Sequence, residues 1–430
     1  MAIWSSDNGE DGFSRRLHEI CFKTNLDYDN RLLPYDIEAL IAHGRMLGAT
    51  GLISVEDSAS IIAALTEMYE EAQNGILKME ARFEDCHSLI EEVLIDRIGD
   101  AGKRLYMARS RNDQVVCATR LYTKDRLKGI DRHLKDFMAN LLEFSQKFEF
   151  APMPGYTHTQ RAMPSSVGMW ASSYLETLLN QKSSINAAIE LNDVNVLGSA
   201  AGYGTAFPID RDFVTAELGL KRTQVNSLSA QLSRGQVECQ TLQSLWGVMF
   251  VVNRMCNDLV WTTSAEFNFF KMSSAVTTGS SIMPNKKNLD PCEIIRARYH
   301  IFSGLLSQAQ GVISNLFYGY NSDYQESKPV LMEGLDLVQT SIEALNIVIC
   351  NTDINEEALK KAFDTDIFST DEVNRHVMAG KTFRDAYREV KQNLDKVELE
   401  DPDQNIRSKH HLGATGNLGL DRLGQRLTDW

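Results

Sequence analysis

Proline is scarce in this sequence. Only 9 of the 430 residues are proline, about 2% where about 5% is usual, and residues 35–151, 209–283 and 330–401 contain none. Because proline ends or kinks helices, these three stretches favour long uninterrupted helices.

Basic residues are also in deficit. The chain carries 44 Lys and Arg against 58 Asp and Glu, a net charge of −14. Nucleic acids and anionic membranes attract broad basic surfaces, so we expect no nucleic-acid and no membrane partner. The sequence also lacks an apolar run of 18 residues and a signal-peptide pattern, as expected of a cytoplasmic protein.

Cysteine lacks the spacing of a metal site or a disulfide framework. The seven cysteines are odd in number and scattered, and no C-x-x-C pair is present. We therefore expect reduced thiols, without a disulfide framework or a zinc site.

Helical periodicity, by contrast, is abundant. Further helices are predicted over residues 165–191, 292–315 and 331–349, and alternating strand patterns are rare. The sequence predicts an all-α fold with a long central helical bundle. Two sets of apolar residues recur at steps of three and four, as on one face of a long helix: Leu127, Ile130, Leu134, Phe137, Leu141 and Phe144, and Leu242, Leu245, Met249, Val252, Cys256 and Leu259.

Two changes of pattern divide the chain. Residues 96–102 have the glycines of a helix end and loop, and the chain becomes more polar after Cys350. We predict an N-terminal helical domain over 1–105, a long-helix bundle domain over 106–350 and a small helical domain over 351–430.

Four polar segments interrupt the helices and are candidates for chemistry. In the first, residues 108–114, a predicted helix is preceded by Ser110, Arg111 and Asn112. These side chains either cap the helix or direct donors at an anion near its N-terminus, where the helix dipole favours negative charge.

The second segment, residues 153–164, contains two prolines and a glycine, which predict a rigid loop. A single histidine is more often structural than catalytic, but His158 is flanked by Thr157 and Gln160, which offer further hydrogen-bonding groups. His158 is therefore a candidate catalytic imidazole.

The third segment, residues 277–293, is either a solvated flexible loop or an anion site. It concentrates hydroxyl, ammonium and amide groups, including Ser280, Lys286 and Asn288. Such groups capture a carboxylate and stabilise developing negative charge, and Gly279 lets the backbone approach an anion closely. This grouping suggests chemistry through a carbanion or oxyanion.

The fourth segment, residues 318–328, is aromatic and polar, and by itself is typical of a surface loop. Residues 197–204 are rich in glycine, but their spacing is not G-x-G-x-x-G and no strand pattern precedes them. They give no support to a dinucleotide-binding or phosphate-binding loop.

Three of these segments together resemble the fumarase/aspartase superfamily. Residues 279–288, GSSIMPNKKN, are similar to its signature G-S-S-x-M-P-x-K-x-N. Residues 110–114, SRNDQ, and 154–160, PGYTHTQ, resemble the versions of two other shared loops in the argininosuccinate lyases. The resemblance extends over residues 27–417.

This resemblance implies a fold and a reaction. The implied fold is a three-domain helical protomer, whose long helices form a twenty-helix core in a homotetramer with active sites shared between subunits. The implied reaction is the reversible anti elimination of argininosuccinate to L-arginine and fumarate, part of arginine biosynthesis, without a metal or organic cofactor.

The resemblance also implies roles for single residues. Ser280 is the implied general base, which removes a proton from the carbon beside a carboxylate of the substrate. Lys286 is implied to stabilise the dianion that results. His158, held by Glu293, is implied to protonate or orient the leaving guanidinium nitrogen. The implied substrate-binding residues are Ser110, Arg111, Asn112, Thr157, Gln160, Asn288, Tyr320, Gln325, Lys328 and His87.

Some positions depart from the family pattern. These departures leave two alternatives open, a lyase acting on another succinyl adduct and a catalytically weak or silent structural homologue of the crystallin type. The customary residues are replaced in the segment 4–8, WSSDN, and at Asn25, Tyr106, Ser229, Gly235 and Leu289.

Overall fold

The structure is a computed structural model, and it describes residues 26–80 and 82–430. The altered segment 4–8 and Asn25 therefore lie outside the described residues. The chain divides into two compact units. Unit 1 comprises residues up to Gly129 with 184–245 and 303–336, and unit 2 comprises 130–183, 246–302 and 337–430. The division into three domains stays a prediction.

Helices dominate both units, which confirms the all-α prediction. No helix in the described part of the chain is long and apolar enough to span a membrane. The longest helices are α2 (Leu26–Ala49), α6 (Arg111–Lys147), α11 (Gln236–Thr262), α12 (Asp290–Val312) and α13 (Ser327–Cys350).

Unit 1 begins with the packed pair α2 and α3. Side-chain caps start two of its helices: Ser54 Oγ accepts the N–H of Asp57 at 3.0 Å, and the carboxylate of Asp85 accepts the N–H of Ser88 at 2.8 Å. Its shorter elements are α3 (Val55–Gln73), α4 (Cys86–Ile98), α5 (Asp100–Arg104), β3 (Val194–Asn195), α9 (Arg211–Glu217), β4 (Arg222–Thr223), α10 (Ser227–Leu232) and η2 (Ser322–Glu326).

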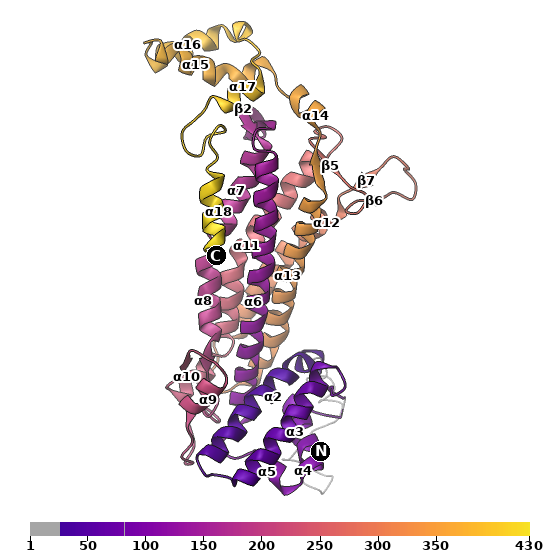
Figure 1. Ribbon diagram of the computed structural model, residues 1–430, viewed down its shortest axis with the longest axis vertical. Coiled ribbons are helices and arrows are strands. Elements are labelled where there is room, and N and C mark those ends of the chain that lie inside the picture. The colour runs from indigo at the N-terminus through magenta and orange to yellow at the C-terminus, as the bar shows by residue number, and fades with distance from the viewer. Residues whose placement is uncertain (1–25, 81) are drawn as a thin grey trace. The chain divides into compact units, whose positions relative to one another are not determined.

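Unit 2 contains near-parallel helices, namely α7 and the C-terminal parts of α6, α11 and α13 (Figure 1). Polar contacts join α7 to α11. Asp258 of α11 accepts hydrogen bonds from two side chains of α7, from Trp170 Nε1 at 3.0 Å and from Tyr174 Oη at 2.6 Å. The apolar residues predicted to form stripes on α6 and α11 are all buried. The helical periodicity is therefore confirmed.

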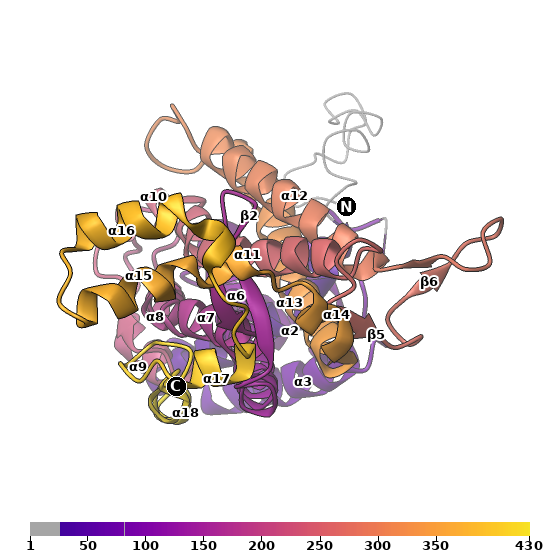
Figure 2. The same cartoon turned by 90° about the horizontal axis from the view of Figure 1, so that it is seen from above.

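Beyond these helices unit 2 carries short strands and small helices. Figure 2 shows α15 and α16 lying side by side, and they enclose a small core that includes Phe368 and Val390. The elements are β1 (Pro152–Thr157), β2 (Gln160–Ser166), α7 (Val167–Leu179), β5 (Phe270–Met272), β6 (Thr278–Gly279), β7 (Lys287–Asn288), β8 (Thr352–Ile354), α14 (Glu356–Lys361), η3 (Thr365–Phe368), α15 (Ser369–Met378), α16 (Phe383–Gln392), η4 (Leu394–Lys396), α17 (Pro402–Arg407) and α18 (Leu420–Thr428). The helix α8 (Lys182–Asn192) begins in unit 2, and most of it belongs to unit 1.

Three local predictions were wrong. The single helix over 165–191 is two helices, because α7 ends at the cap Asn180 and α8 starts at Lys182. The segment 96–102 is mostly helical, since Gly99 at φ 61° only separates α4 from the short α5. The segment 153–164 is a β-hairpin rather than a loop, and its strands β1 and β2 pair in antiparallel register.

The buried stripe of α6 generates a stability prediction. Phe137 has no exposed surface, whereas Phe383 is 60% exposed. We expect Phe137→Ala to lower the free energy of unfolding by about 3–5 kcal/mol, because it leaves a cavity in a packed core. Phe383→Ala, the matched control, should change it by less than about 0.5 kcal/mol. Urea unfolding followed by circular dichroism measures both, and equal losses would contradict the burial of this stripe.

Candidate active site

The predicted site residues fall into two groups, one in each compact unit. Unit 2 contains the implied catalytic residues and unit 1 contains most of the implied binding residues. The residues of unit 1 are His87, Ser110, Arg111, Asn112, Tyr320, Gln325 and Lys328, and those of unit 2 are Thr157, His158, Gln160, Ser280, Lys286, Asn288 and Glu293.

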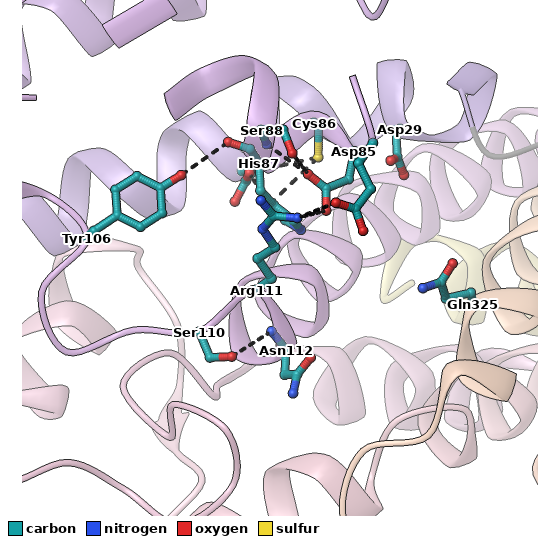
Figure 3. A network of polar contacts seen from close by, with 12 residues as sticks. Asp29, Asp85, Cys86, His87, Ser88, Tyr106, Ser110, Arg111, Asn112 and Gln325 are labelled. Carbon is teal, nitrogen blue, oxygen red and sulfur yellow. Dashed lines mark hydrogen bonds and ion pairs between the residues drawn. The ribbon is translucent and has the colours of Figure 1, made fainter. Parts of the chain in front are cut away.

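The start of α6 is a capping box. Ser110 Oγ accepts the N–H of Asn112 at 3.3 Å, and Asp113 Oδ1 accepts the N–H of Ser110 at 3.0 Å. The Ser110 and Asn112 side chains lie together at this helix start (Figure 3). Both alternatives for this segment therefore remain compatible, because one helix N-terminus serves as a cap and as a place for an anion.

Arg111 is occupied by protein carboxylates. Its Nη1 lies 3.0 Å from Glu84 Oε2 and 3.1 Å from Asp85 Oδ2. Burial is the largest influence on the guanidinium and lowers its pKa, but the two carboxylates outweigh burial, and the pKa of Arg111 is raised. The structural role for Arg111 is thus directly visible in its contacts.

His87 lies in a buried charge network. Its Nδ1 donates to Asp36 Oδ2 at 2.6 Å, while Gln114 Nε2 donates to Asp36 Oδ1 at 3.2 Å. Burial, the largest influence, disfavours the imidazolium, but Asp36 and nearby carboxylates outweigh it, so the pKa of His87 is raised. Figure 3 shows His87 beside Asp85 and Arg111. This histidine is held in one orientation.

Lys328 is also paired. Its Nζ lies 2.6 Å from Asp29 Oδ1, and both side chains are buried. Nearby in the sequence, Gln325 Nε2 donates to Tyr320 Oη at 3.2 Å. The buried guanidinium of Arg234 lies over the Tyr320 ring, 5.2 Å from its centroid, and burial lowers the pKa of Arg234. The structure therefore brings Gln325 and Tyr320 into contact.

Three partners of these residues were not among the predicted site residues: Asp29, Asp36 and Arg234. Asp29 and Asp36 both belong to α2 and are buried. They fall on the apolar stripe that also contains Leu33, Leu40 and Leu47. Positions 29, 33, 36 and 40 follow one another at steps of four, three and four residues, and position 47 lies seven residues, or two helical turns, further on. Carboxylates on a buried helical stripe require a cation or donors, so the signal was present. No comparable pattern in the sequence indicated that Arg234 is buried beside Tyr320.

The hairpin of β1 and β2 places His158 at its tip. His158 and Thr159 have φ of 50° and 62°, the positive values of a two-residue turn of type I′. Thr157 and Gln160 are the last register pair before the turn. All four side chains are exposed, and no hydrogen bond joins His158 to Glu293 among the described residues. Their pairing stays a prediction.

The third segment forms a loop on a two-residue ladder. Thr278 pairs with Asn288 and Gly279 with Lys287, and residues 280–286 form the loop between them. Ser280 Oγ accepts the N–H groups of Ile282 at 3.3 Å and Met283 at 3.0 Å. Hydrogen bonds to an oxygen favour its charged form. The two bonds are the local contacts of a serine turn, and they also favour negative charge on Ser280 Oγ.

Comparisons with known proteins identify the family of the chain. A family model described as "Lyase" matches residues 19–300. The argininosuccinate lyase of Sorangium cellulosum (strain So ce56) is 39% identical over 93% of both chains. That of Xanthomonas campestris pv. campestris (strain B100) is 36% identical over 93% of this chain and 92% of its own. The chain belongs to the argininosuccinate lyase family.

Solved structures of more distant proteins share the fold of this argininosuccinate lyase family member. An EDDS lyase in complex with formate has a TM-score of 0.79 at 21% identity and covers 96% of this chain and 89% of its own. A class II fumarase from Schistosoma mansoni has a TM-score of 0.72 at 18% identity, and the match covers 87% of this chain and 90% of the fumarase chain.

Two departures from the argininosuccinate lyase pattern have local explanations. Gly235 has φ of 76°, and a Cβ there would lie 2.2 Å from Ile313 Cγ2, so an aspartate does not fit this backbone. Tyr106 Oη donates to the carbonyl of His87 at 3.5 Å, and Arg109 stacks 4.0 Å from its ring centroid. Nothing in the structure explains Ser229 or Leu289.

The buried pair of Asp36 and His87 generates a pH prediction. The pKa of His87 is raised, so its stabilisation is complete below the unfolded value of about 6.5 and is lost as the pH rises through the folded value. We expect His87→Gln to lower the free energy of unfolding by about 3 kcal/mol at about pH 6, and the loss to shrink toward about pH 9.

Urea unfolding at several pH values measures this difference. The control is His133→Gln, because His133 Nε2 forms a half-exposed pair with Glu343 at 3.2 Å and such pairs contribute at most about 1 kcal/mol. A loss for His87→Gln that stays constant from pH 6 to pH 9 would contradict the charged pair.

Proposed function

We propose that this chain cleaves argininosuccinate reversibly to L-arginine and fumarate, as a step of arginine biosynthesis. The identity to proteins named argininosuccinate lyase over 93% of the chain carries this proposal. The loop geometry at Ser280 supports the chemistry, because the elimination needs a base beside a group of anion-stabilising donors.

The proposed base is Ser280. It removes the proton from the carbon beside a succinyl carboxylate, and the resulting dianion is stabilised by Lys286 and Asn288. A serine hydroxyl is a poor base in water, but the N–H groups of Ile282 and Met283 at its Oγ stabilise the alkoxide form. Lys286 adds positive charge from the same loop.

The proposed proton donor to the leaving guanidinium nitrogen is His158, oriented by Glu293. Its exposed place at a hairpin tip leaves both ring nitrogens open to a substrate. The proposed contacts to the fumaryl part are Ser110, Asn112, Thr157, Lys286 and Asn288, those to the arginine part are Tyr320, Gln325 and Lys328, and Arg111, Gln160 and His87 line the site.

The proposed assembly is a homotetramer with shared sites. An exposed aromatic group on α11 and α12 supports it: the Trp246 and Phe250 rings stack with centroids 5.4 Å apart, and Tyr299 lies 6.4 Å from each. Ile294 and Ile301 are more than half exposed on α12. Apolar surface of this kind is typical of a protein interface.

The proposal includes neither a metal nor an organic cofactor, because proton transfer and anion stabilisation suffice for this elimination. It also includes a cytoplasmic location, where the six described cysteines remain as the free thiols found here.

Fumarate absorbance after addition of argininosuccinate tests the function. Fumarate release supports the proposal. Release from another succinyl adduct instead would identify the alternative lyase, and no release from any adduct at high protein concentration would favour the silent structural homologue.

Ser280→Ala should lower kcat by at least about 10²-fold, because it removes the proposed base. Ser274→Ala is the control, since Ser274 is an exposed serine that lies three residues before this segment, and its kcat should match the wild type. Steady-state fumarate assays compare the variants, and a wild-type kcat in Ser280→Ala would assign the base role to another residue.

Shared active sites predict complementation. Ser280→Ala and His158→Asn proteins should each be inactive, but a mixture that is dissociated and reassembled should recover part of the activity, because some sites then combine an intact Ser280 with an intact His158. Recovery is measured as fumarate release against each variant treated alone. Mixed tetramers without recovery would show that one chain supplies both residues of a site.

A further inference from the structure

Asp113 has an unusual set of contacts for a residue in the first turn of a helix. Its side chain is completely buried, yet no cation pairs with it among the described residues. Its two oxygens accept three backbone N–H groups instead: Oδ1 accepts from Ser110 at 3.0 Å, and Oδ2 accepts from Gly198 at 2.9 Å and from Ala200 at 2.8 Å.

These contacts balance a buried charge. Burial, the largest influence, raises the pKa of Asp113 to about 6, while the three N–H groups and, after them, the charge of Arg109 lower it. The carboxylate is therefore ionised at neutral pH. Charge-assisted hydrogen bonds of this kind are short and strong, so Asp113 is a rigid junction between its partners.

The capping box uses only one of the two oxygens. The other oxygen reaches a loop 85 residues further along the chain. That loop bends toward it through left-handed backbone, with φ of 84° at Gly198 and 53° at Ala200, and consecutive N–H groups in such a bend converge on an anion. A helix cap alone does not require this second set of bonds.

We propose that Asp113 is a positioning residue, which holds the Ser110–Asn112 segment against the 197–204 loop so that Ser110 and Asn112 meet a carboxylate of the succinyl group. This inference rests on the proposed function, in which these two residues bind the fumaryl part. In this proposal, the glycine-rich loop 197–204, which fits no nucleotide-binding pattern, serves to support the segment Ser110–Asn112.

Asp113→Asn tests the proposal. Asparagine retains one acceptor oxygen but turns an N–H donor toward a backbone N–H, so one side of the junction is lost. We expect the dissociation constant of fumarate, measured by calorimetry, and the KM for argininosuccinate to rise about tenfold. The kcat should fall less than about threefold, because the proposed catalytic groups lie elsewhere.

Asp193→Asn is the matched control. Asp193 Oδ1 accepts the N–H of Lys221 at 3.0 Å and pairs with Lys124 Nζ at 2.7 Å, so it also ties two segments of unit 1. It should lose thermal stability with unchanged fumarate affinity. If Asp113→Asn likewise loses only stability, or lowers kcat without raising KM, the positioning role is wrong.

Hydrogen exchange on the wild-type protein provides a second test that needs no variant. Fumarate should slow exchange both in peptides covering residues 106–114 and in peptides covering residues 196–204, because the Asp113 carboxylate joins these two segments. Slowing in the first peptide alone would overturn the coupling. Wild-type protein that neither binds fumarate nor cleaves argininosuccinate would instead contradict the proposed function, so the two failures are distinguishable.

Discussion

Buried carboxylates are the constraint on which unit 1 depends. An ionised carboxylate removed from water must obtain a cation or several donors. Asp29 obtains Lys328, Asp36 obtains His87 and Gln114, and Asp113 obtains three backbone N–H groups. Apart from the bond between Asp113 and Ser110, each of these bonds joins residues at least 51 positions apart in the sequence. The charges thus determine which segments meet, while apolar burial supplies most of the stability.

The helices of the fold were predictable from the sequence, whereas the pairing of strands and of charged residues was not. Helix periodicity identified the stripes of α6 and α11, because a 3.6-residue repeat is a local property. The hairpin at 152–166 was mistaken for a loop, since its prolines and Gly155 are typical of both and the pairing of Pro154 with Pro164 involves ten residues of separation. The position of Asp29 on an apolar stripe is a local signal, but its pairing with Lys328, 299 residues away, is not local and could not be predicted.

The candidate site is marked in the sequence by its motifs, but the contacts of its residues are not. The motifs marked Ser280, His158 and Ser110, and the structure adds what the motifs lack, the N–H groups at Ser280 Oγ and the carboxylates around Arg111. An exposed loop surrounded by water is a poor place to stabilise a dianion, because preorganised donors act most strongly where water is excluded. The proposed tetramer would supply that cover.

The charge balance of the site follows from these pairings. Lys328 and Arg111 are among the implied substrate-binding residues, but each is already paired with aspartate or glutamate. They therefore contribute hydrogen bonds and shape more than net charge. If the proposed site is right, positive potential for the substrate comes mainly from Lys286 and from backbone N–H groups at the start of α6 and in the loop of Ser280. Backbone N–H groups act only when the backbone is held in place, so the proposed function gives the buried carboxylates of unit 1 a supporting role in binding, although none of them attracts the substrate.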